Sequence, residues 1–106
     1  MGRASTVVKA QDEVVGIDVK NNTGDTLGKI EEVMLDKISG QVAYVALDCG
    51  SFLGIGGKLF ALPWNALHYD AANHCFIANI SKERLQNATG FDKDHWPAQA
   101  DTALAA

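Results

Sequence analysis

The sequence has no long hydrophobic run, few cysteines and prolines, and no concentration of positive charge. Its 106 residues include 2 Cys, 2 Pro and 9 Lys or Arg against 13 Asp or Glu, so the formal net charge is -4. No apolar stretch approaches the ~20 residues that span a bilayer as a helix, so we expect no membrane insertion. Nucleic-acid binding usually needs a clustered basic face, and the basic residues here are scattered. We therefore expect no nucleic-acid partner.

The N-terminal residues and the cysteines indicate a cytoplasmic protein. A signal peptide needs a long apolar core, and residues 1–12 offer only the pair Val7-Val8. Cys49 and Cys75 lack C-x-x-C spacing, which favours two reduced thiols that behave as small hydrophobic side chains. We expect neither a metal nor a cofactor.

The motifs of common catalytic sites are also missing, so we expect no enzymatic activity. No serine lies in a G-x-S-x-G elbow. The neighbours Glu31 and Glu32 would face opposite sides of a strand and could not act as a carboxylate pair. The glycines before Lys58 lack phosphate-loop spacing, and Leu59 stands where that motif requires Ser or Thr.

The stretch from Val42 to Trp64 organises the chain. Two apolar runs are joined by a glycine-dense segment in which Gly54, Gly56 and Gly57 allow a tight backbone turn. Pro63 closes the second run, because proline cannot donate to a β-ladder. The pattern predicts a β-hairpin.

Further strands are predicted on both sides of this hairpin. Alternating apolar residues favour a strand over 14–19, and turn residues flank another strand over 27–36. In the latter we place a bulge near Glu31-Glu32, so that Ile30, Val33 and Leu35 share the core face. Residues 64–67 suggest one helical turn, and Cys75 to Ile80 a last strand.

Ser81 has the character of an N-cap for a short helix over 82–89, with Gly90 suited to follow its C-terminus. Beyond it, residues 91–97 are expected to form an ordered strap. Five or six short strands in sequential antiparallel order and one C-terminal helix predict an all-β fold, a small closed antiparallel barrel, since closure removes exposed edges. We expect one domain over 13–97, a flexible arm over 1–12 and a disordered tail over 98–106.

The chain resembles the PRC-barrel family, named for the cytoplasmic domain of the photosynthetic reaction centre H subunit. The resemblance covers about residues 14–97 and is carried by Thr23-Gly24, Leu27-Gly28-Lys29-Ile30, Val33 to Asp36, Tyr44 to Leu47, Gly54 to Lys58, Ala61 to Trp64, and Phe91-Asp92 with Trp96-Pro97. It implies a barrel that serves as an assembly or adaptor surface, as in the H subunit and in the C-terminal domain of the ribosome-maturation factor. It does not imply catalysis.

Four aromatic residues, Trp64, Tyr69, Phe91 and Trp96, are the candidate binding residues. We expect Trp64 to fill the core, whereas Trp96 suits an intramolecular anchor and an interface equally well. The leading hypothesis is a non-enzymatic protein-interaction adaptor that also self-associates, as a dimer, through an edge strand or the strap. One alternative is a small-ligand or redox-cofactor-binding protein that uses the glycine-rich hairpin and Cys49. A second is an RNA- or ribosome-associated factor.

Overall fold

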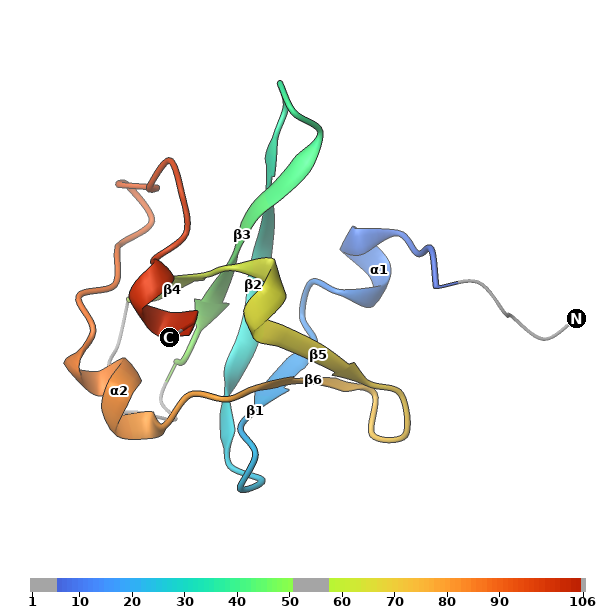
Figure 1. The fold of residues 1–106 in the computed structure, drawn as a ribbon, viewed down its shortest axis with the longest axis vertical. Coiled ribbons are helices and arrows are strands. Elements are labelled where there is room, and N and C mark those ends of the chain that lie inside the picture. The colour runs from blue at the N-terminus through green and yellow to red at the C-terminus, as the bar shows by residue number, and fades with distance from the viewer. Residues whose placement is uncertain (1–5, 51–57, 106) are drawn as a thin grey trace, which may run out of the picture.

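The computed structural model describes residues 6–50 and 58–105, and its main feature is a six-stranded sheet in the order β4-β3-β2-β1-β6-β5 (Figure 1). Short helical segments surround this sheet. The elements are α1 (Ala10–Glu13), β1 (Asp18–Lys20), β2 (Thr26–Asp36), β3 (Gln41–Asp48), β4 (Leu59–Leu62), the 3-10 turn η1 (Trp64–Ala66), β5 (Leu67–Asp70), β6 (Cys75–Ala78), α2 (Lys82–Asn87) and the 3-10 turn η2 (Thr102–Ala105).

The all-β prediction is confirmed, but the prediction of a closed antiparallel barrel is wrong. β1 pairs antiparallel with β2 and parallel with β6, while β4 and β5 end the sheet. A flat six-stranded sheet would hold its end strands about 24 Å apart. The chain from Leu62 to Leu67 reaches at most about 18 Å, so the sheet must bend. Pro63 and η1 form the corner between the end strands, and the strands diverge from it instead of pairing (Figure 1).

The predicted bulge in β2 is confirmed. Ile30 lies opposite Leu47 and Glu32 opposite Ala46, which leaves Glu31 as the extra residue. A second irregularity lies between Met34 and Leu35. Leu35 is 60% exposed, so its predicted place on the core face is wrong. The β2–β3 hairpin extends past the rest of the sheet, at the top of Figure 1, and Leu35 lies on this extension.

The core is formed by the bent sheet together with α2 and η2. Its members are buried aliphatic and aromatic side chains, among them Val19, Leu27, Ile30, Val45, Leu47, Phe60, Leu62 and Leu85. Gly28 is buried on β2, where a Cβ would clash with the main-chain carbonyl of Asp48 on β3. The close approach of these two strands therefore requires glycine.

Several element boundaries differ from the predictions. The first strand begins at Asp18, because the chain turns before it through Gly16 (φ +88°). β5 was not predicted. The hairpin glycines Gly54, Gly56 and Gly57 lie outside the described residues. Ser81 does cap α2, accepting a 3.1 Å hydrogen bond at Oγ from the N–H of Arg84, but the helix ends at Asn87.

The C-terminal residues return to the sheet and cover the outer edge of β4. The strap predicted over 91–97 extends to Asp101, so the strap of the structure comprises residues 91–101. Phe91 exchanges two main-chain hydrogen bonds with Leu59, at 2.7 and 2.8 Å, and the N–H of Asp101 donates to the carbonyl of Ala61 at 2.9 Å. Leu104 is only 3% exposed. The prediction of a disordered tail over 98–106 is therefore corrected for residues 98–105, because Leu104 packs into the core.

The N-terminal residues are described from Thr6, and α1 forms a single exposed turn at the end of the arm predicted over 1–12, extending one residue beyond it. Across residues 6–50 and 58–105, no helix has the length and apolar character needed to cross a bilayer.

Candidate functional site

The four aromatic residues selected from the sequence fall into two separate clusters. Trp64 and Tyr69 both contact Phe76, whereas Phe91 and Trp96 contact each other. We call the first group the β5 aromatic cluster (Trp64, Tyr69, Phe76) and the second, which includes Tyr44, the strap aromatic cluster (Tyr44, Phe91, Trp96). Their surroundings differ in ways that matter for binding.

In the β5 aromatic cluster, the exposed rings of Trp64 and Tyr69 pack against the buried ring of Phe76. Phe76 on β6 is 5% exposed and lies directly opposite Tyr69 in the ladder. The Tyr69 ring is 5.2 Å from it and the Trp64 ring 5.8 Å, at interplanar angles of 59° and 65°. Trp64 is 42% exposed and Tyr69 55%. The prediction that Trp64 fills the core is therefore wrong, since η1 places it at the corner between the sheet ends.

The strap aromatic cluster is held by hydrogen bonds within the chain. Phe91 lies 6.2 Å from Tyr44 and 5.1 Å from Trp96, measured between ring centroids. The hydroxyl of buried Tyr44 donates to the Pro97 carbonyl at 2.8 Å, and the indole N–H of Trp96 donates to the Lys93 carbonyl at 2.7 Å. Although Trp96 is 37% exposed, its polar atom is already used. These contacts make Trp96 an intramolecular anchor of the strap.

A third apolar surface, at the tip of the β2–β3 hairpin, was missed from the sequence. Leu35 and Val42 are opposite each other in the ladder and are 60% and 36% exposed. Ile38, in the turn between the strands, is 89% exposed. The available signal was an isoleucine inside a turn of the sequence Asp-Lys-Ile-Ser-Gly, where a polar residue is usual.

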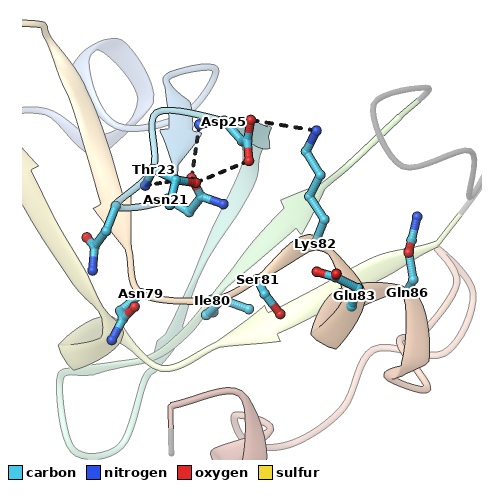
Figure 2. Close-up of a pocket in the computed structure, with 10 residues that line it drawn as sticks. Asn21, Thr23, Asp25, Asn79, Ile80, Ser81, Lys82, Glu83 and Gln86 are labelled. Atoms are coloured by element: carbon cyan, nitrogen blue, oxygen red, sulfur yellow. Dashed lines mark hydrogen bonds and ion pairs between the residues drawn. The ribbon is translucent and has the colours of Figure 1, made fainter.

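A polar hollow of about 580 Å³ lies between the β1–β2 turn and α2 (Figure 2). Asn21, the buried polar residue on its wall, accepts at Oδ1 from the N–H of Thr23, the hydroxyl of Thr23 and the N–H of Asp25, at 3.1, 2.7 and 2.9 Å. Lys82 of α2 reaches across to Asp25, with 3.8 Å between Nζ and Oδ1. These interactions organise the turn and fasten it to α2, which explains the polar side chains by a structural role.

The titratable groups with shifted pKa values lie outside this hollow. Burial, with a smaller effect from the Asp48 charge, raises the pKa of the Cys49 thiol to about 12. Cys49 is fully buried, and both cysteines are free. On the strap, a 2.7 Å hydrogen bond with His95 lowers the pKa of Asp92. A thiol that remains protonated is a poor nucleophile and a poor redox group.

One known protein family matches most of the chain. The model of the PRC-barrel domain matches residues 7–85, which span α1, all six strands and the first part of α2. The chain belongs to the PRC-barrel family. Among curated proteins, none matches its sequence closely. Trp64, Tyr69 and Phe76 lie within the matched part of this PRC-barrel chain, whereas the strap follows it.

Proposed function

We propose that this PRC-barrel protein is a non-enzymatic adaptor that binds other proteins through the β5 aromatic cluster. The observation that carries the proposal is the pair of exposed rings, Trp64 at 42% and Tyr69 at 55%, fixed on the buried ring of Phe76. Rigid aromatic side chains that remain accessible are typical of interface hot spots, because they bury a large area and lose little conformational entropy.

The position of the cluster supports the same function. Tyr69 lies on β5, an end strand of the sheet, and Trp64 lies at the corner that leads into it. An end strand can accept another strand, and neighbouring aromatic side chains add specificity to such main-chain pairing. The partners that we propose include a second copy of the chain, with a dimer as the favoured assembly.

The proposed location is the cytoplasm. Cys49 and Cys75 are both buried and unpaired, which suits a reducing compartment. The protonated state favoured for Cys49 counts against the redox-cofactor alternative. The RNA alternative gains no support from a chain of net charge -4.

The adaptor function is tested with three versions of the protein: wild type, Trp64→Ser and Ile38→Ser. Ile38→Ser is the matched control, because it also removes an exposed apolar side chain but lies on the hairpin tip. Each tagged version is expressed in the native host, and captured proteins are identified by mass spectrometry. The dissociation constant of each purified partner is then measured.

We expect Trp64→Ser to weaken binding by about tenfold or more, the loss typical of a hot-spot residue, and Ile38→Ser to leave it within about twofold. Circular dichroism spectra of the variants must match that of the wild type. Equal binding by wild type and Trp64→Ser would contradict the proposal. Selective loss in Ile38→Ser would instead assign docking to the hairpin tip.

A further inference from the structure

The two end strands of the sheet differ in how their outer edges are used. The outer edge of β4 is occupied by the chain itself, through the hydrogen bonds of Leu59 with Phe91 and of Ala61 with Asp101. β5 pairs on one side with β6, and among residues 6–50 and 58–105 no segment pairs with its other side. One edge is therefore covered and the other is open.

An open strand edge is a template for pairing with another strand, and proteins commonly protect such edges with proline, lysine or a covering segment. The sequence of β5 is Leu-His-Tyr-Asp, which contains neither proline nor lysine. The exposed ring of Tyr69 lies on this strand, and Trp64 lies next to its start. The outer edge of β5 is therefore suited to pairing with a further strand.

We propose that β5 pairs antiparallel with β5 of a second copy of the chain, across a two-fold axis at Tyr69. The inference rests on the proposed adaptor function and names the partner of the β5 aromatic cluster. The two sheets then join into one continuous sheet, and each copy presents the same surface to the other, as a two-fold dimer requires.

Complementary side chains favour this register. His68 and Asp70 lie on the face of β5 opposite to Tyr69, because side chains alternate along a strand. An axis at Tyr69 places Tyr69 opposite its own copy and His68 opposite Asp70 of the second copy. An axis at Asp70 would instead place two carboxylates opposite each other, and an axis at His68 would leave Asp70 with no opposite residue in β5. The first register therefore gives an aromatic pair at the centre and an imidazole–carboxylate pair on each side.

Disulfide cross-linking tests the register directly. All proteins carry Cys75→Ala, because Cys75 lies opposite Asp70 within one chain and would capture a cysteine placed there. Cys49 stays, since it is fully buried. His68→Cys and Asp70→Cys proteins of different tag lengths are oxidised separately and as a mixture, and the products are separated on non-reducing gels.

We expect the mixture to form the cross-linked heterodimer about tenfold faster than either protein links to itself, because directly opposite side chains are much closer than diagonal ones. Tyr69→Cys should link to its own copy. Equal rates in the mixture and in the separate proteins would overturn the register, as would no cross-linking in any of them.

Sedimentation measurements add a second test that needs no cysteine. Tyr69→Lys places two like charges at the proposed axis and should raise the dimer dissociation constant about tenfold or more. Gln41→Lys, at an exposed strand position far from β5 in the sheet order, is the matched control and should change it by less than about twofold.

The outcomes separate this inference from the adaptor function itself. A wild-type chain that sediments as a monomer at every concentration contradicts the β5 pairing. If Trp64→Ser still weakens binding of a different protein in that case, the adaptor function stands without the dimer. If Trp64→Ser changes no interaction either, both proposals are wrong.

Discussion

Tyr44→Phe should loosen the strap while leaving the sheet intact. The Tyr44 side chain is 1% exposed, and its hydroxyl makes one hydrogen bond, to the Pro97 carbonyl at 2.8 Å. The change removes that bond and keeps the ring, including its edge contact with Phe91. A typical intramolecular hydrogen bond contributes about 1 kcal/mol net. We therefore expect the free energy of unfolding to fall by about 1 kcal/mol.

Urea unfolding measures this loss, and amide hydrogen exchange locates it. In a chain of this size, about 1 kcal/mol corresponds to a fall of about 4–8 °C in melting temperature, with an unchanged denaturant slope. Exchange should accelerate at the N–H groups of Phe91 and Asp101, which hold the strap to β4, and stay slow within β2 and β3. Wild-type stability with unchanged exchange at both amides would show that the strap does not depend on Tyr44.

Three further predictions concern the core and the ionisable groups. Gly28→Ala should destabilise the protein by about 2 kcal/mol or more in urea unfolding, because the added methyl meets the adjoining strand. The control Lys29→Ala changes an exposed side chain and should destabilise it by less than about 0.5 kcal/mol. Equal effects of the two changes would contradict the close approach of the strands. The Cys49 thiol should resist a thiol reagent until the protein unfolds. Its pKa is raised in the folded protein, so between about pH 8.5 and 12 the folded chain keeps a proton that the unfolded chain loses, and the free energy of unfolding should fall as the pH rises through this range. A denaturation midpoint that does not change with pH over that range would contradict this. His95→Ala should raise the pKa of Asp92 in an NMR titration, since the imidazole stabilises the carboxylate, and an unchanged value would exclude that hydrogen bond in solution.

Local features of the fold were accessible from the sequence because neighbouring residues determine them. The bulge at Glu31 follows from a one-residue slip in the apolar pattern of β2. The cap at Ser81 needs only a hydroxyl and the N–H of Arg84, three residues later. Likewise, the helical turn predicted over 64–67 corresponds to η1.

Features that depend on distant residues could not be predicted in the same way. The parallel pairing of β1 with β6 joins Val19 to Phe76, and the sequence near either strand contains no sign of it. Burial of Leu104 depends on the whole core, so a single leucine in an alanine-rich tail did not predict it. Sequence alone identified Trp64 and Trp96 as candidates. It could not show that the Trp96 indole is hydrogen-bonded within the chain, because that depends on the position of the Lys93 carbonyl.

The two tryptophans of the chain allow one measurement of where proteins dock. ¹H–¹⁵N NMR spectra recorded over a range of protein concentrations, and then with a captured partner, report both indole N–H groups separately. Docking at the β5 aromatic cluster predicts that the Trp64 indole and the amides of β5 shift. The indole N–H signal of Trp96, which is hydrogen-bonded to the Lys93 carbonyl, should not shift. Shifts confined to Trp96 and the strap, with Trp64 and β5 unchanged, would contradict docking at the β5 aromatic cluster.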